Sequence, residues 1–260
     1  MMLPVAPNRE LGQHFLVDGN ILGVIGRLAE LEPDDVVLEV GPGLGVLTEY
    51  LAERVGHVHA VELDRGLEPH LAERLASREN VDLAFGDAPR LDLAALEPAS
   101  TKFVANLPYN VATPLIVESL DGLPRIGHWT VMVQREVADR LFARPSTKAY
   151  GAVSVLVQLA TERTGFHPVS RTVFRPPPNV DSALVAFRRT PLPKEFDAIK
   201  SVVEAAFAHR RKTLPNSLEL AGLAQRERAV EALAEIDRRP NVRAEALEPD
   251  EFVTLTAALR

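Results

Sequence analysis

A glycine-rich loop between an apolar strand and a helix is the feature that most constrains how this chain can fold. Residues 36–40 form a short apolar run, and Gly41-Pro42-Gly43-Leu44-Gly45 follows it directly. Residues 44–53 then have the pattern of a helix. Ligands of open parallel sheets bind at the carboxyl ends of the strands, where loops of this kind lie. The sequence therefore predicts an α/β fold with a ligand pocket beside this loop.

Strand-like and helical segments alternate along the residues that follow. The expected strands are 57–63, 81–85, 102–104 and 129–133, and the expected helices are 67–75, 113–120 and 136–142. A helix capped by Asp18 is expected before the first strand. This alternation predicts an open parallel sheet with helices on both faces. Residues 153–159 and 182–187 are expected to form two further strands at an antiparallel edge.

The composition changes near Thr190-Pro191-Leu192-Pro193. Beyond this segment apolar residues recur at helical spacing, at Phe196, Ile199, Val203 and Phe207, and again in residues 229–236 and 251–259. The sequence therefore predicts two domains, residues 1–190 with the glycine loop and a small helical domain of residues 191–260.

The composition excludes several classes of protein. The 260 residues contain no cysteine, which excludes disulfide bonds and thiolate metal sites. No signal peptide or membrane-spanning stretch is evident, so we expect a cytoplasmic protein. The net charge of −7 argues weakly against a nucleic-acid partner. However, the acidic excess lies in residues 1–185, and a local basic patch can bind phosphate even on an acidic protein.

Two acidic residues at predicted strand ends favour a cofactor pocket. Glu62 ends the second strand of the sheet, where an acidic residue can bind ribose hydroxyls. Asp87 follows the third strand and could accept a hydrogen bond from an adenine amine. Either acid alone is more simply explained as a solvated residue at a strand end. Because a dinucleotide fingerprint requires a small residue where this chain has Val46, the loop favours S-adenosylmethionine, which has no pyrophosphate.

The tetrapeptide Asn106-Leu107-Pro108-Tyr109 follows the short apolar run 103–104. It places an amide, a proline-containing turn and an aromatic ring at the carboxyl end of a strand. Amide and backbone carbonyl oxygens accept hydrogen bonds from an exocyclic amine, and a tyrosine ring offers a flat surface to a base. The tetrapeptide therefore predicts a site for an adenine amine. The alternative is a strand-to-helix turn with a buried tyrosine.

Seven segments stand in a characteristic order. They are Gly12-Gln13-His14-Phe15-Leu16, Glu39-Val40-Gly41-Pro42-Gly43-Leu44-Gly45, Val61-Glu62-Leu63-Asp64, Gly86-Asp87-Ala88, Asn106-Leu107-Pro108-Tyr109-Asn110, Phe174-Arg175-Pro176-Pro177-Pro178-Asn179-Val180-Asp181-Ser182-Ala183 and Arg210-Arg211-Lys212-Thr213-Leu214. In this order the chain resembles the ribosomal RNA adenine dimethyltransferase family over residues 8–260, and most closely its small-subunit branch.

The resemblance implies a fold, an activity and a cofactor. The fold is that of class I S-adenosylmethionine-dependent methyltransferases, a Rossmann-like seven-stranded sheet with a helical C-terminal RNA-binding domain. The activity is N6,N6-dimethylation of two adjacent adenosines near the 3′ end of small-subunit (16S) ribosomal RNA, during maturation of that subunit. The residues implied to contact S-adenosylmethionine are His14, Leu16, Gly41, Gly43, Glu62, Asp87 and Asn106.

The same resemblance implies how the target adenine is held. Asn106 Oδ1 and the carbonyl of Leu107 or Pro108 are expected to accept hydrogen bonds from the amine. Tyr109 is expected to stack on the base, and Phe174 to cover its other side. Phe174 could instead be a core residue.

Five basic residues are expected to contact RNA phosphates: Arg188, Arg189, Arg210, Arg211 and Lys212. The alternative for such a run is a solvated helix face. The chain departs from the family pattern at Pro215 and Glu10, and both departures weaken the expected positive surface.

His57 and His59 lie two residues apart on one predicted strand and could form a metal-binding pair. No third ligand is evident from the sequence, so we interpret the pair as structural and predict no metal site.

Two other readings of the sequence stay open. One is a different adenine methylase, either a large-subunit ribosomal RNA enzyme of the macrolide-resistance type or a DNA adenine methylase, although the latter typically has Asp-Pro-Pro-Tyr. The other is a non-enzymatic checkpoint factor in ribosome assembly. The expected partner is small-subunit ribosomal RNA within a partly assembled 30S subunit, bound by a monomer without a membrane partner.

Overall fold

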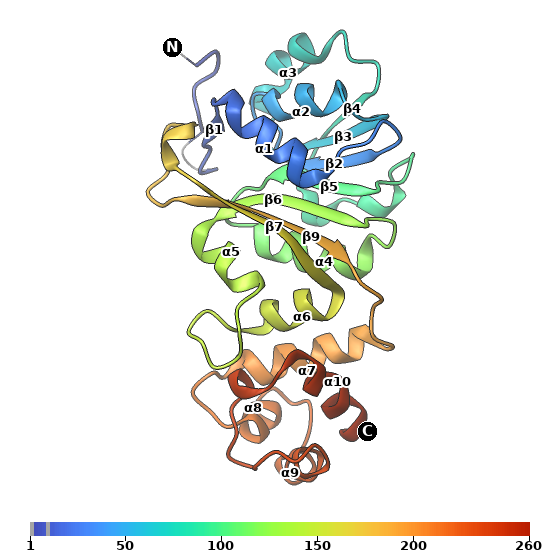
Figure 1. Ribbon diagram of the computed structural model, residues 1–260, viewed down its shortest axis with the longest axis vertical. Helices are drawn as coiled ribbons and strands as arrows, with labels where there is room; N and C mark the ends of the chain where they lie inside the picture. Colours follow the sequence, from blue (N-terminus) through green and yellow to red (C-terminus); the bar gives the residue numbers. More distant parts are fainter. Residues whose placement is uncertain (1–2, 9–10) are drawn as a thin grey trace. The chain divides into compact units, whose positions relative to one another are not determined.

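The computed structural model describes residues 3–8 and 11–260 of the chain (Figure 1). The strands are β1 (Phe15–Leu16), β2 (Val36–Val40), β3 (His57–Glu62), β4 (Val81–Phe85), β5 (Lys102–Asn106), β6 (His128–Gln134), β7 (Thr161–Val169), β8 (Phe174–Arg175) and β9 (Ser182–Arg189). The α-helices are α1 (Gly19–Ala29), α2 (Val46–Ala52), α3 (Glu68–Leu75), α4 (Ala112–Gly122), α5 (Arg135–Leu141), α6 (Ala152–Ala160), α7 (Phe196–Ala208), α8 (Leu214–Leu220), α9 (Arg226–Glu235) and α10 (Pro249–Ala258).

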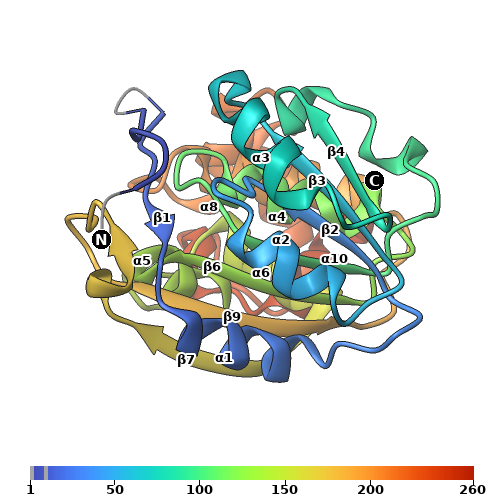
Figure 2. The same cartoon turned by 90° about the horizontal axis from the view of Figure 1, so that it is seen from above.

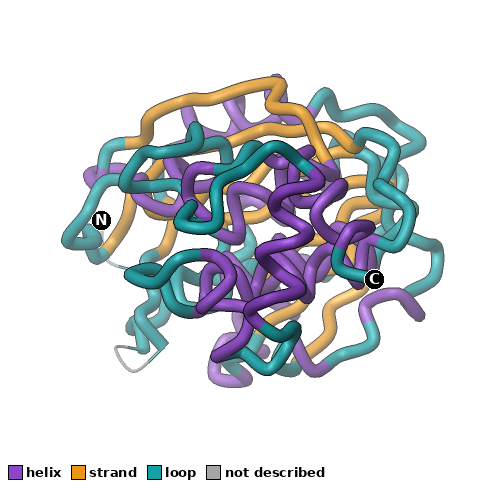
Figure 3. Tube along the Cα trace, turned by 90° about the horizontal axis from the view of Figure 1, so that it is seen from below, coloured by secondary structure: helices purple, strands orange, loops and turns teal. Residues whose placement is uncertain are grey.

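Seven strands form one mixed sheet in the order β4-β3-β2-β5-β6-β9-β7. The pairs among β4, β3, β2, β5 and β6 are parallel, whereas β9 pairs with β6 in the antiparallel direction. The alternation of helices and strands can be followed along the Cα trace in Figure 3. This arrangement confirms the α/β sheet and the antiparallel edge that the sequence predicts.

Residues 152–160 form helix α6, so the strand predicted at 153–159 is wrong. A short apolar run has the composition of a buried strand and of a buried helix alike, and periodicity alone does not separate them. Here the turn at Gly151 begins a helix, because the Ser154 hydroxyl accepts the Gly151 N–H at 3.1 Å and itself donates to the Arg140 carbonyl at 2.6 Å. The strand follows directly, as β7.

The two faces of the sheet are covered by different helices. Val37, Val104, Met132 and Leu184 project from one face and pack in the same buried cluster as Ile25 of α1. On the other face the Trp129 ring stacks on Phe187 at 5.4 Å, and its indole N–H donates to the Ser119 hydroxyl of α4 at 2.8 Å. Each strand therefore alternates between two apolar layers, as expected for a central sheet.

A small two-stranded sheet joins the N-terminal segment to a later loop. Leu16 of β1 pairs with Phe174 of β8 in the antiparallel direction. Figure 2 shows β1 running directly into α1, whose N-terminus is capped by the Asp18 carboxylate. The predicted cap at Asp18 is thus confirmed.

The chain divides into two compact units. One comprises Met1–Ala138 and Arg163–Arg189, and the other comprises Asp139–Glu162 and Thr190–Arg260. The compositional change near residue 190 coincides with one unit boundary. Residues 139–162, which the sequence places in the first domain, group instead with the helical unit because α6 contacts α7 and α10. No helix in the described part of the chain has the length and apolar character needed to cross a membrane.

The guanidinium of Arg189 closes the C-terminal end of α4. It donates to the carbonyls of Leu120 at 2.5 Å, Ile126 at 2.6 Å and Leu123 at 3.0 Å. The same group lies 4.9 Å from the centre of the Trp129 ring. Burial lowers the pKa of Arg189, which is the direction expected for a cation removed from water.

We expect Arg189→Lys to lower the free energy of unfolding by about 1–3 kcal/mol, because one ammonium group does not replace three planar N–H contacts. Arg188→Lys is the matched control, since Arg188 is half-exposed and makes an ion pair with Glu30 at 2.8 Å. Urea denaturation of both variants checks the prediction. Equal losses in the two variants would contradict it.

Candidate active site

A cavity lies at the carboxyl ends of β2, β3, β4 and β5. It is lined by residues of six segments: 11–16, 39–47, 61–63, 86–89, 106–111 and Phe174. All the residues that the sequence predicts for the cofactor and for the target base line this one cavity. The structure therefore brings together motifs that are separated by up to 160 residues along the chain.

The glycine loop adopts a backbone that few other residues tolerate. Gly41, Gly43 and Gly45 have φ angles of 78°, 58° and 74°, in the left-handed region. A β-carbon placed on Gly41 would lie 3.1 Å from the ring of Pro108, and one on Gly43 would lie 3.1 Å from the ring of Phe15. The loop therefore packs directly against the tetrapeptide turn on one side and against β1 on the other.

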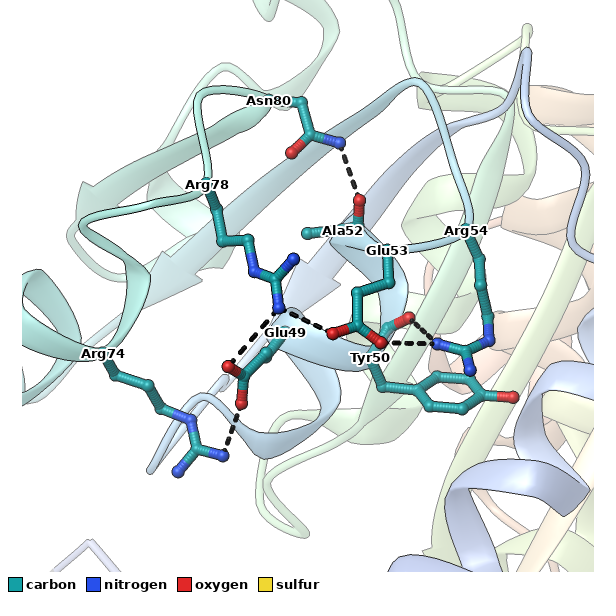
Figure 4. A network of polar contacts seen from close by, with 8 residues as sticks. All are labelled: Glu49, Tyr50, Ala52, Glu53, Arg54, Arg74, Arg78 and Asn80. Carbon is teal, nitrogen blue, oxygen red and sulfur yellow. Dashed lines mark hydrogen bonds and ion pairs between the residues drawn. The ribbon is translucent and has the colours of Figure 1, made fainter.

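Ion pairs hold α2, which begins at the glycine loop, against α3 (Figure 4). Arg74 contacts Glu49 at 2.7 Å, and Arg78 contacts Glu53 at 2.6 Å and Glu49 at 3.6 Å. In Figure 4 the Arg78 guanidinium lies between the two carboxylates. These contacts fix the direction of α2 and hence the position of the loop at its N-terminus.

The carboxylate of Glu62 is held from two sides by backbone groups. Gly43 N–H donates to Oε2 at 3.0 Å and Asp64 N–H donates to Oε1 at 2.9 Å. Burial raises the pKa of Glu62, and these bonds counteract that rise. The side chain is only 5% exposed, so its oxygens have a fixed orientation beside the glycine loop. Fixed oxygens of this kind suit the hydroxyl pair of a ribose.

A second carboxyl, Glu39, lies beneath the loop and was not predicted from the sequence. It is 1% exposed, and its Oε2 has no hydrogen-bond partner among the described residues. Burial raises the pKa of Glu39 to about 8, the nearby Thr48 side chain lowers it, and the charge of Glu62 raises it further. Glu39 is therefore neutral at pH 7. The available signal was an acidic residue inside the otherwise apolar run 36–40.

The tetrapeptide forms a turn at the end of β5. Leu107 N–H donates to the Met132 carbonyl at 3.0 Å, and Val111 N–H donates to the Pro108 carbonyl at 3.2 Å. Asn106 is half-buried and lines the cavity. The Pro108 carbonyl is thus engaged inside the turn, which favours Leu107 of the two carbonyls that the sequence leaves open.

Tyr109 is anchored at its hydroxyl, 2.8 Å from the Ser182 hydroxyl of β9. Burial raises the pKa of Tyr109, so the phenol is neutral throughout the physiological range. Its ring lies 6.0 Å from that of His14, whose Nδ1 is 2.8 Å from the Pro176 carbonyl. The tyrosine is half-buried with its hydroxyl fixed, and it lines the cavity.

Phe174 lies in the core. It lines the cavity, but it is 2% exposed and belongs to the same buried cluster as Leu16 and Ile21. A ring that is packed on this scale has little free surface for a base. The structure therefore supports the alternative of a core residue.

Leu63 was missed by the sequence reasoning. It follows Glu62 directly, lines the cavity and is 51% exposed, which is unusual for a leucine at a strand end. Asp87 is half-buried across the same cavity, and its carboxylate contacts Arg90 Nε at 3.3 Å. An exposed apolar side chain in a cavity that two acids also line is suited to a flat aromatic ligand. The sequence signal for Leu63 was its position directly after Glu62.

Arg188 and Arg189, two of the predicted phosphate contacts, already have partners within the protein. β9 runs antiparallel to β6, so Arg188 pairs with His128, the first residue of β6. Arg188 therefore lies at the amino ends of the parallel strands, whereas the cavity lies at their carboxyl ends. Arg189 is held by the α4 carbonyls described above. Arg189 stabilises the fold at the end of α4, whereas the exposed ion pair between Arg188 and Glu30 contributes little.

The remaining basic residues lie in the helical unit. Arg210, Arg211 and Lys212 are all exposed, and Arg210 Nη2 also donates to the Tyr150 carbonyl at 2.9 Å. Pro215 is buried in the first turn of α8, where a missing N–H costs nothing. Glu10 lies outside the described residues.

The fold and the cavity together define a class I S-adenosylmethionine-dependent methyltransferase. The chain belongs to the ribosomal RNA adenine dimethylase family, whose sequence profile matches residues 6–259.

Individual relatives agree with this assignment. The chain is 47% identical to the ribosomal RNA small subunit methyltransferase A of Rubrobacter xylanophilus, covering 96% of this chain and 94% of that protein. Its structure is similar to that of a dimethyladenosine transferase from Plasmodium falciparum, with 25% identity, a TM-score of 0.80 and coverage of 93% and 96% of the two chains. It is also similar to the 23S rRNA methyltransferase ErmE, with 30% identity, a TM-score of 0.66 and coverage of 94% and 99%.

The buried Glu39 carboxyl predicts a pH dependence of stability. Its pKa is about 8 in the folded protein against an ordinary value of 4.5, so the unfolded chain loses the proton first as the pH rises. The free energy of unfolding should therefore fall between about pH 4.5 and pH 8, by up to about 1.4 kcal/mol per pH unit from this group.

Glu39→Gln, which has nearly the same shape and no titrating proton, should remove this contribution. Urea denaturation of the wild type and the variant at several pH values measures it, with the exposed Glu79→Gln as a control. Parallel curves for the wild type and Glu39→Gln would show the interpretation to be wrong.

Proposed function

We propose that this protein transfers methyl groups from S-adenosylmethionine to N6 of two adjacent adenosines near the 3′ end of 16S ribosomal RNA. The observation that carries the proposal is the packing of the glycine loop against the Asn106–Tyr109 turn, so close that a β-carbon added to Gly41 would lie 3.1 Å from the Pro108 ring. The glycine loop, which suits a cofactor, and the Asn106–Tyr109 turn, which suits an adenine amine, therefore line the same cavity. The name of the Rubrobacter relative supports small-subunit ribosomal RNA as the substrate, and the name of the Plasmodium structure supports dimethylation of adenosine.

The residues around the cavity fit the cofactor. Gly41 and Gly43 line the cavity without side chains, so a ligand could approach their backbone closely. Glu62 would accept hydrogen bonds from the ribose hydroxyls, and Leu63 would contact the face of the cofactor adenine. Asp87 would accept a hydrogen bond from the adenine amine. When bound, S-adenosylmethionine supplies an electrophilic methyl group on a sulfonium.

The tetrapeptide turn would orient the target amine. Asn106 Oδ1 and the Leu107 carbonyl would each accept one N–H, which directs the nitrogen lone pair toward the cofactor side of the cavity. Tyr109, fixed through Ser182, would stack on the base. Most of the rate acceleration would then come from positioning and from oriented dipoles. The base must leave its stack to enter the cavity, so the RNA target is a loop or flexible strand.

The substrate context and the RNA contacts are further parts of the proposal. The RNA would be bound within a partly assembled 30S subunit by a monomer. Arg211 and Lys212 are exposed in the helical unit and are the candidates for phosphate contacts.

Asn106→Ala is expected to lower the rate of methyl transfer by about 10²–10³-fold, because it removes one acceptor that positions the amine. The measurement is transfer of labelled methyl groups to small subunits that lack the modification, with the modified nucleotides mapped. Asn241→Ala, an exposed asparagine of the helical unit, is the control. A rate like that of the wild type would refute the role of Asn106, and label in 23S RNA would favour a large-subunit methylase.

Replacing both Arg211 and Lys212 by Glu should weaken RNA binding and flatten its salt dependence, by about one unit of slope for each lost phosphate contact. Filter binding to small subunits over a range of salt concentrations measures this slope. Exposed Arg243→Glu is the control. An unchanged slope in the double variant would exclude this segment from the RNA site.

A further inference from the structure

A cluster of side chains at the amino ends of β3 and β4, away from the cavity, has no part in the proposed function. His57 and His59 project from the same face of β3, and Asp82 of the neighbouring strand β4 lies opposite His59 in the parallel register. Figure 1 shows β3 and β4 side by side at the end of the sheet. Asp82 Oδ2 lies 3.0 Å from His57 Nε2 and 3.7 Å from His59 Nδ1.

The two ring nitrogens of His59 are in different surroundings. Nε2 lies 2.8 Å from the Pro98 carbonyl, an acceptor only, so this nitrogen carries a proton and donates it. Nδ1 is buried without a hydrogen-bond partner among the described residues, and the residue is 2% exposed. In the neutral tautomer, the lone pair of Nδ1 therefore faces the Asp82 carboxylate. Two acceptors that face each other at the rim of the sheet, one of them on a buried histidine, can share a cation between them.

The ligand atoms have the spacing of a metal site. His57, His59 and Asp82 each offer one ligand atom, and these atoms all lie within 4.8 Å of one another. Tetrahedral zinc with bonds of about 2.0–2.2 Å separates its ligands by about 3.3–3.6 Å. The observed distances of 3.0 Å and 3.7 Å lie on either side of that range.

The surroundings complete the arrangement. The bond from His59 Nε2 to the Pro98 carbonyl is the outer contact that metal-binding histidines usually make through their second nitrogen. The Asp82 side chain is 63% exposed, which leaves one side open for a water ligand. We propose that His57, His59 and Asp82 bind one divalent transition-metal ion of the zinc type.

The ion would join β4 to β3 at their amino ends. β4 is the outermost strand of the sheet on this side, and four of its five residues are only partly buried. The opposite ends of the same two strands carry Glu62 and lead into Asp87. A bond at the amino ends would therefore hold the edge strand without contact with the reacting groups. The inference is independent of the proposed function.

The test uses the full chain, freed of metal with a chelator and titrated with zinc chloride alone. We expect one zinc ion per chain by elemental analysis and calorimetry, and a rise in Tm with zinc. Asp82→Asn and His57→Gln should each raise the Kd at least about tenfold. Exposed Glu79→Gln, three positions before Asp82, should leave the Kd unchanged.

Circular dichroism verifies that each variant is folded, and because Asp82 is largely exposed the Asn variant keeps its packing. The proposal is overturned if the wild type binds no zinc, or if Asp82→Asn and His57→Gln bind zinc as tightly as the wild type. A Tm that changes with pH but is the same with zinc and with chelator would also overturn it. That result would assign the cluster to an ion pair between protonated His59 and Asp82.

Discussion

The left-handed backbone of the glycine loop is the constraint on which the rest of the site depends. It turns the chain sharply between β2 and α2, and it lets the ring of Pro108 approach to a distance that a side chain would block. The glycine loop and the Asn106–Tyr109 turn meet at this contact. A shift of the loop would therefore move both halves together, and the ion pairs between α2 and α3 resist such a shift.

Electrostatics in the cavity follow from the different environments of two neighbouring acids. Glu62 accepts two backbone N–H bonds, whereas one oxygen of Glu39 has no partner among the described residues. Burial favours the protonated form of Glu39, which lowers the negative charge that Glu62 faces from that side. In the proposed function, the Glu62 carboxylate would accept hydrogen bonds from the ribose hydroxyls of the cofactor.

The parts that could be predicted from the sequence are those encoded in short segments. The glycine loop, Glu62 and the Asn106–Tyr109 turn are each recognisable from a few consecutive residues. The parallel pairing of β2, β3, β4 and β5 brings the carboxyl ends of these strands together. The parts that could not be predicted depend on tertiary packing. The run 153–159 has no periodicity that separates helix from strand, and Phe174 and Arg189 were placed by surroundings that are distant in the chain. The third member of the histidine cluster came from the strand register, which pairs His59 with Asp82.

The reversed direction of β9 has a consequence for the order in which the protein can be completed. Because β9 runs antiparallel to β6, its first residue, Ser182, arrives at the cavity and meets the Tyr109 hydroxyl. The partner of that tyrosine is thus encoded 73 positions downstream. During synthesis from the N-terminus, strands β2–β6 can pair before β9 has been made. At that stage the Tyr109 hydroxyl does not yet have its Ser182 partner. Tyr109 is anchored only after β9 has been synthesised and has paired with β6.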